Sequence, residues 1–264
     1  MTATVSAAQK GVTYVMSDAK TWITNNGCAA CHRAGSVLTG QAIGKHNGLS
    51  INDSATTGMT WLAQVVKNEQ QADGGWTHSG SLRRAKTGWS MAGLAQYTQW
   101  SGSSVFASAL KPAINWMNSN SSTAAFANDG LTFAGQTKKY IPQDHGSCPV
   151  DCNPTGPTFM TVQSIAVLLA QPGLSAAERT TYTDLMNSLT DYLEGNAIRN
   201  ITNNGWGAQY LSYALVGMAA AGRLPSNNAN ALAIRDRLLV LGGGANTGWG
   251  DVNFGYGSNP LSTG

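Results

Sequence analysis

One short turn motif recurs along the chain at a nearly constant spacing. A glycine followed by a tryptophan or a cysteine stands at Gly27-Cys28, Gly75-Trp76, Gly205-Trp206 and Gly248-Trp249. The first interval is 48 residues and the last is 43, while the 130 residues between Trp76 and Trp206 correspond to two periods plus an insertion. Self-similarity at this period is typical of repeat folds, and each period here reads as two helices around one turn. We therefore expect a ring of helical hairpins.

The outer helices of this ring are expected to be amphipathic. Ser175 is followed three residues later by Glu178, which is the pattern of a capping box. Apolar residues then recur at intervals of three and four, as at Tyr182, Leu185 and Leu189. This spacing predicts a helix with one buried face and one solvent-exposed face. Similar helices are expected over residues 5–25, 57–70, 103–119 and 226–241.

The segments that follow the turns have a different pattern. Residues 159–171 and 210–222 are apolar nearly all round, which is typical of helices covered on both sides. Amphipathic helices with one solvent-exposed face would thus alternate with helices that are buried on all sides. This alternation fits a ring of two layers, with the fully buried helices in the inner layer. The sequence shows no strands, so the predicted class is all-α.

Length and composition narrow the possible functions. With 264 residues, of which 42% are hydrophobic, we expect a single domain over residues 1–264. The net charge of +3 is spread thinly over 16 basic and 13 acidic residues, which argues against nucleic acid as a partner. No run of eighteen apolar residues occurs, so no transmembrane segment is expected. The first ten residues lack the apolar core of a signal peptide, so an exported protein would be present here as its mature form with an added Met1.

The segment QQADGGW, from Gln70 to Trp76, matches a known repeat motif. It resembles the Gln-x-x-Asp-Gly-x-Trp repeat of the squalene-hopene and oxidosqualene cyclases, whose domains are α/α toroids. The resemblance implies an α/α toroid of about four to five helical hairpins. After Trp249 the sequence shows no further inner helix, so the ring is open, cut from a longer chain or completed by a partner. Cyclase chemistry is not implied, because the Asp-x-Asp-Asp motif of those enzymes does not occur here.

A loop-rich insertion is expected at about residues 120–156, a stretch rich in Ser, Asn, Gly and Pro. It holds the string DHGSCPVDC, in which Cys148 and Cys152 are expected to form a short disulfide if the compartment is oxidising. The toroid also hosts zinc-dependent prenyl transfer with an Asp, Cys and His ligand set. His145, Asp151 and the two cysteines offer those types, but their close spacing does not resemble that family's scattered ligands.

Cys28-Ala29-Ala30-Cys31-His32 has the spacing of a c-type haem attachment site. In such sites the two thiols form thioethers to the porphyrin vinyl groups, and the adjacent imidazole is the proximal iron ligand. With 4 Cys and 4 His in 264 positions, chance would produce the pattern on the order of once in a thousand chains. The motif resembles that of the cytochromes c. This implies one covalent haem c held by Cys28, Cys31 and His32, and a periplasmic or extracellular location.

Three other interpretations of the same residues stay open. Cys28 and Cys31 could form a disulfide, or act as a redox pair of the thioredoxin type, although that type needs a βαβ setting. They could also supply half of a zinc site whose other ligands lie elsewhere.

The position of the motif predicts where a haem would lie. Cys28 stands where Trp76 and Trp206 stand in their repeats, so the porphyrin would replace a large aromatic at one end of the ring. Burial there would set the potential of the haem and exclude water from it.

The sixth iron ligand is expected from a neighbouring turn. His78 lies in the loop of the next repeat, and inner helices 8–10 Å apart give roughly the separation that bis-histidine ligation needs. His145 in the insertion and Met160 at the start of an inner helix are alternatives, as is an open site. His46 could serve only if the helix expected over 33–47 is broken, because an intact helix places it about 21 Å from His32.

Arg83 and Arg84 follow His78 and could neutralise haem propionates, although solvated surface arginines are the commoner explanation. The leading hypothesis is an exported monohaem c-type cytochrome that transfers single electrons to or from a redox partner protein. One alternative is a haem c-dependent oxygenase or peroxidase acting on a hydrophobic small molecule in the toroid lumen. Another is a haem-free toroid that serves as a binding module, with Cys28 and Cys31 joined by a disulfide.

Overall fold

The computed structural model describes residues 3–29, 32–77, 82–143, 154–202 and 208–241, with only the backbone at positions 3, 4 and 32. Within these ranges lie nine α-helices, one 3-10 helix and one two-stranded sheet. In chain order they are α1 (Ala3–Asn26), α2 (His32–His46), α3 (Met59–Asn68), α4 (Arg83–Trp100), η1 (Ala107–Ala109), α5 (Leu110–Ser119), β1 (Ser122–Ala125), β2 (Thr137–Tyr140), α6 (Thr155–Ala170), α7 (Ala176–Asn200), α8 (Ala208–Ala220) and α9 (Ala229–Leu241). The mostly helical class predicted from the sequence is therefore confirmed.

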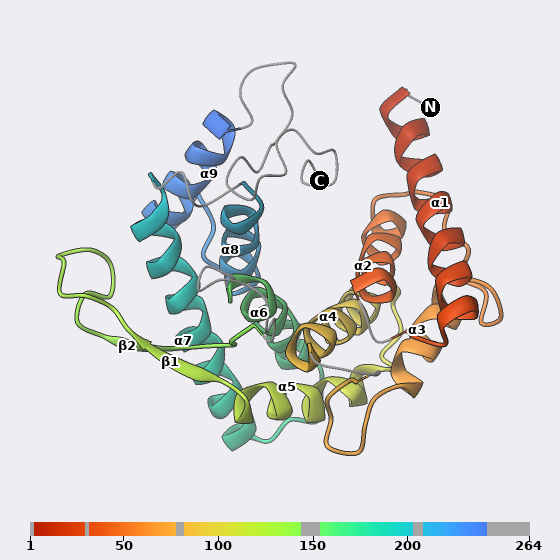
Figure 1. The fold of residues 1–264 in the computed structure, drawn as a ribbon, viewed down its shortest axis with the longest axis horizontal. Helices are drawn as coiled ribbons and strands as arrows, with labels where there is room; N and C mark the ends of the chain where they lie inside the picture. Colours follow the sequence, from red (N-terminus) through yellow and green to blue (C-terminus); the bar gives the residue numbers. More distant parts are fainter. Residues whose placement is uncertain (1–2, 30–31, 78–81, 144–153, 203–207, 242–264) are drawn as a thin grey trace.

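The helices lie in two layers along an arc (Figure 1). The even-numbered helices α2, α4, α6 and α8 form the inner layer and pack against one another in that order. The odd-numbered helices lie outside them, with α1 at one end of the arc and α9 at the other (Figure 1). The apolar core fills the space between the layers, and its fully buried members include Leu38, Leu62, Met91, Ile114 and Ile165.

The inner helices all run in the same direction. Gly35 of α2 packs against the backbone of Trp89 in α4, and at the other end of both helices the ring of His46 lies 3.9 Å from that of Trp100. Equivalent contacts join α4 to α6 and α6 to α8 through Gly88 with Met160 and Phe159 with Tyr213. The start of every inner helix therefore lies at one edge of the arc, the N-terminal rim, and the end of every inner helix at the opposite edge, the C-terminal rim.

The predicted amphipathic helices are largely confirmed. Ser175 accepts a hydrogen bond from the N–H of Glu178 at 3.3 Å, and the Glu178 carboxylate accepts one from the N–H of Ser175 at 2.9 Å, which completes the capping box of α7. The helix expected over 103–119 begins later than predicted, as η1 and then α5. Pro112 lies in the first turn of α5, where its missing N–H costs nothing, but it cannot continue an α-helix from the residues before it.

The inner helices differ in how fully they are covered. α6 is buried on most sides, as predicted, with Phe159, Val162 and Ile165 among its buried residues. α8 is less covered than predicted, because Val216 is 43% exposed. That side chain lies at the C-terminal rim, where the inner layer is hollowed.

The insertion corrects the expectation of a chain without strands. β1 and β2 form an antiparallel hairpin with Ser122 opposite Tyr140 and Ala125 opposite Thr137, and it lies along α7 (Figure 1). The N–H of Lys139 donates to Oγ of Ser188 at 3.0 Å, which joins the hairpin to that helix. The expected disulfide between Cys148 and Cys152 lies outside the described residues.

None of the helices in the described part of the chain combines the length and the apolar character that a membrane span requires.

Candidate functional site

The segment that carries Cys28 joins outer helix α1 to inner helix α2 at the N-terminal rim. α1 ends where Gly27 adopts a left-handed conformation, with φ of 59°, and donates its N–H to the carbonyl of Ile23 at 2.8 Å. Cys28 follows with 7% of its surface exposed, next to the fully buried Ala29. His32 is the first residue of α2. Its side chain, together with Cys31, lies outside the described residues.

Glu69, at the end of α3, holds this segment from the neighbouring repeat. Its Oε1 accepts a hydrogen bond from the N–H of Ala29 at 2.5 Å. Its Oε2 is buried, and no described residue donates a hydrogen bond to it. Glu69 was not predicted as a site residue from the sequence, although it directly precedes the Gln70–Trp76 motif. The two turns of neighbouring repeats therefore lie side by side.

The turn between α3 and α4 shows what the repeat motif does. The Gln70 side chain donates from Nε2 to the carbonyls of Gly74 at 3.0 Å and Ala109 at 2.9 Å, and so joins its own turn to the start of the next hairpin. Trp76 is fully buried, and its Nε1 donates to the carbonyl of Val66 at 2.7 Å. In this chain the motif thus has a structural role, because its side chains join the turn to α3 and to the start of the next hairpin.

Cys28 and Trp76 occupy comparable places. Each lies buried in the linker between an outer helix and the inner helix that follows it. Trp206, the third residue of the comparison, lies outside the described residues.

Arg83 and Arg84 lie at the start of α4, on the same rim. Arg83 forms two hydrogen bonds from Nη2 to the Asp73 carboxylate, at 2.5 and 2.7 Å, and its guanidinium lies 4.7 Å from the ring centre of Trp116. The bond from Arg83 lowers the pKa of Asp73. Nε of Arg84 donates to the carbonyl of Asn120 at 3.2 Å. Arg83 thus already balances one carboxylate within the turn, and a haem propionate would have to compete with Asp73 for it.

The structure does not meet the condition under which His46 was considered as an iron ligand. α2 runs without a break from His32 to His46, so the two residues lie at opposite rims, about 21 Å apart along the helix axis. The His46 ring instead packs on Trp100. One iron atom cannot have both as axial ligands, and the favourable position of His46 in the last turn of a helix needs no metal.

Met160 lies in the core between α4 and α6. Only 2% of its surface is exposed, and its side chain fills the space beside Gly88. This is the packing of a core methionine, which argues against its role as an iron ligand.

The remaining ligand candidates cannot be placed. His78, His145, Cys148 and Cys152 lie outside the described residues. Among the residues that are described, no group of three or more His, Cys, Asp or Glu side chains could hold a metal ion.

Comparison with known proteins gives no family. No protein-family model, no curated protein and no solved structure matches this chain. Its function is therefore argued from its own residues.

Proposed function

We propose that this chain is an exported monohaem c-type cytochrome built on an α/α toroid, and that it exchanges single electrons with a redox partner protein. The observation that carries the proposal is the Cys28-Ala29-Ala30-Cys31-His32 spacing at the start of an inner helix. The toroid is supported by the alternation of outer and inner helices and by the parallel course of the inner layer. Covalent haem attachment of this kind takes place outside the cytoplasm, which favours a periplasmic or extracellular location.

The described residues around the motif fit a haem c. The buried position of Cys28 beside Ala29 offers an apolar setting for one thioether. A metal-bound imidazole usually donates its second ring N–H to a carboxylate or carbonyl, which fixes the orientation of the ring. Oε2 of Glu69 is such an acceptor, buried beside the attachment segment and without a partner among the described residues.

Each residue of the motif then has a distinct role. Cys28 and Cys31 hold the porphyrin through thioethers, and His32 is the proximal ligand. Glu69 fixes the segment through the Ala29 N–H, and its second oxygen is a buried acceptor beside the motif without a described partner. When bound, the haem supplies reversible one-electron chemistry at its iron, with a potential set by its axial ligands and its burial.

His78 is the proposed sixth ligand. The hydrogen bond between Ala29 and Glu69 brings the first two turns together at the N-terminal rim. His78 follows Glu69 by only nine residues, in the linker that leads into α4. His145 and an open sixth position remain the alternatives. Two strong axial ligands would leave no place for oxygen or peroxide, so the site would transfer electrons only.

The first test is whether the protein carries covalent haem. After expression with haem-maturation machinery, we expect a Soret band and an intact mass raised by one haem, and Cys28→Ala should lose one of the two covalent links. No Soret band in the wild type would end the proposal. A protein without the haem increment, in which peptide mapping shows a disulfide between Cys28 and Cys31, would indicate the disulfide-bonded binding module instead.

The second test concerns the sixth ligand. His78→Met should raise the reduction potential, because a methionine in place of a histidine ligand favours the reduced haem. His46→Gln is the matched control and should leave the spectrum and the potential unchanged, since His46 lies at the opposite rim. Rapid binding of carbon monoxide to the reduced wild type would contradict six-coordination and favour a haem enzyme.

A further inference from the structure

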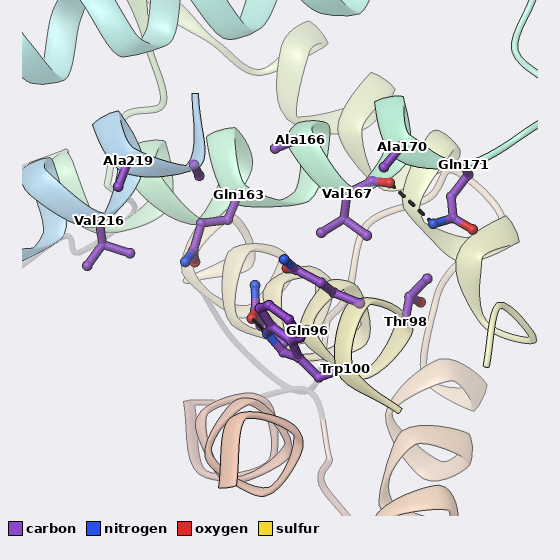
Figure 2. A pocket seen from close by; sticks show the side chains of 12 residues that line it. Gln96, Thr98, Trp100, Gln163, Ala166, Val167, Ala170, Gln171, Val216 and Ala219 are labelled. Carbon is purple, nitrogen blue, oxygen red and sulfur yellow. Dashed lines mark hydrogen bonds between the residues drawn. The ribbon is translucent and has the colours of Figure 1, made fainter. Parts of the chain in front are cut away.

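A cavity of about 580 Å³ opens at the C-terminal rim, at the opposite end of the inner helices from Cys28. Its walls come from the last turns of α4 and α8 and from the second half of α6 (Figure 2). The volume falls within the range of roughly 300–1,000 Å³ that is usual for ligand pockets. The proposed cytochrome function does not use this cavity.

Most of the polar side chains that line the cavity are amides, and Thr98 adds a hydroxyl. Four glutamines line it, and none of the described residues that form its wall is charged. Each amide offers both a donor and an acceptor. The four are Gln96 and Gln99 from α4, Gln163 from α6 and Gln171 directly after α6.

These amides are only partly used within the protein. Gln96 is 5% exposed and accepts a hydrogen bond from Nε1 of Trp100 at 2.7 Å, while no described residue bonds to its Nε2. Gln99 and Gln163 have no hydrogen-bond partner among the described side chains or backbone groups. Figure 2 shows Gln163 extending from α6 toward Gln96 and Trp100 of α4. Gln99 is exposed and Gln163 is half-buried, so water reaches these two amides and a ligand can take its place.

The rest of the lining adds an apolar surface. Alanine and valine side chains such as Ala166, Ala219 and Val216 cover the walls on α6 and α8 (Figure 2). Three inner helices reach their C-terminal ends here, but several of their last carbonyls already have partners, such as Arg179 on the carbonyls of Leu169 and Gln171. No described cationic side chain lines the cavity, so its wall offers no charged partner to an anion.

We propose that this cavity binds a neutral saccharide. A sugar presents adjacent hydroxyl groups that match the paired donor and acceptor of a glutamine amide. Its C–H faces suit the alanine and valine walls and the amphipathic ring of Trp100. A carboxylate ligand would find no partner cation, and a wholly apolar ligand would bury the amides without hydrogen bonds.

Gln163 is the central residue of the proposed site. It comes from the middle of the three helices, and its amide lies between the walls that α4 and α8 provide (Figure 2). Leucine at this position keeps nearly the same volume and removes both hydrogen-bonding groups. Gln64 offers a matched control, because it lies exposed on outer helix α3, where its amide donates to Asn68.

The test is calorimetric titration of the purified full chain with two neutral disaccharides, maltose and cellobiose. Digalacturonic acid serves as the charged comparison and farnesol as the apolar one. We expect at least one neutral disaccharide to bind, Gln163→Leu to weaken that binding at least about tenfold, and Gln64→Leu to leave it unchanged. Gln99→Leu, at an exposed position of the same wall, should weaken it as well and provides a second measurement if Gln163→Leu folds poorly.

The proposal is overturned by several clear outcomes. They are the absence of heat from both neutral disaccharides at millimolar concentration, tighter binding of digalacturonic acid or farnesol, and unchanged binding in a folded Gln163→Leu variant. Each can be scored with or without haem in the protein, so failure of the cytochrome proposal would not affect the result.

Discussion

At the level of single residues, Gly74 explains why the turn between α3 and α4 is so tight. Its φ of +95° is a conformation that side-chain-bearing residues rarely adopt, and a Cβ built there would lie 2.3 Å from the carbonyl oxygen of Pro112 in α5. The obstacle is backbone, which cannot rotate away as a side chain would. One glycine therefore allows two successive hairpins to meet at the N-terminal rim.

We expect Gly74→Ala to destabilise the protein by about 3 kcal/mol, because strain at positive φ and a backbone clash add together. Gly102→Ala is the matched control: its φ of +75° is also positive, but no atom lies within 4 Å of the added Cβ. That variant should cost only about 1 kcal/mol. Urea unfolding of both variants measures the difference, and equal losses would show that the contact between Gly74 and α5 does not form.

The residues of the candidate site were predictable to different degrees. Cys28 and His32 were found from sequence because their spacing is local and chemically specific. Glu69 was missed because its contact with Ala29 spans 40 residues, and no local pattern indicates a hydrogen bond between two turns. The pairing of Arg83, at the start of α4, with Asp73 in the preceding turn was not predicted either, because no local pattern shows which carboxylate a guanidinium contacts.

At the level of elements, the start of α7 combines a predictable feature with an unpredictable one. The capping box between Ser175 and Glu178 was evident in the sequence and is confirmed. The salt bridge from Lys111 of α5 to Glu178 was not, since the two lie 67 residues apart. Together they lower the pKa of Glu178 to about 2, with Lys111 the larger cause and the Ser175 bonds next.

This lowered pKa predicts a specific dependence of stability on pH. Because the folded carboxyl has a pKa near 2 and its usual value is 4.5, its contribution is present above about pH 4.5 and is lost as pH falls toward 2. We expect thermal midpoints measured from pH 6 to pH 3 to fall more steeply in the wild type than in Glu178→Gln, which keeps the capping pattern but not the charge. Lys111→Met should remove most of the same difference, and identical slopes in all three proteins would contradict the pairing.

The insertion shows where element prediction failed and why. β1 and β2 are each four residues long, and β1 has the sequence Ser-Thr-Ala-Ala, which has little strand propensity. The hairpin instead rests on tertiary contacts with α7, such as the bond from Lys139 to Ser188 and the salt bridge between Lys138 and Asp191. Contacts with a distant helix produce no periodic pattern in the sequence. An amphipathic helix, in contrast, is predicted from the spacing of its apolar residues alone.

At the level of the whole molecule, the parallel inner layer separates two proposed sites. The N-terminal rim carries the proposed haem-attachment motif, and the C-terminal rim carries the amide-lined cavity. α2 and α4 run between the two proposed sites. At one rim Glu69 holds the segment that leads into α2, and at the other rim His46 of α2 packs on Trp100 of α4. The spacing of these two helices therefore affects both sites.

Two glycines in α2 test this arrangement. A Cβ at Gly35 would lie 2.3 Å from the backbone oxygen of Trp89, so Gly35→Ala must push α2 away from α4. We expect a loss of about 3 kcal/mol in the free energy of unfolding and a weaker near-ultraviolet dichroism from Trp100 as the His46 contact loosens. Gly40→Ala lies in the same helix with no atom within 4 Å, and should stabilise the protein by roughly 0.5–1 kcal/mol through helix propensity. Urea unfolding and dichroism of the two variants provide the measurement. If Gly35→Ala were as stable as Gly40→Ala, α2 and α4 would not pack against each other at Gly35. The two rims would then have no physical link through these helices.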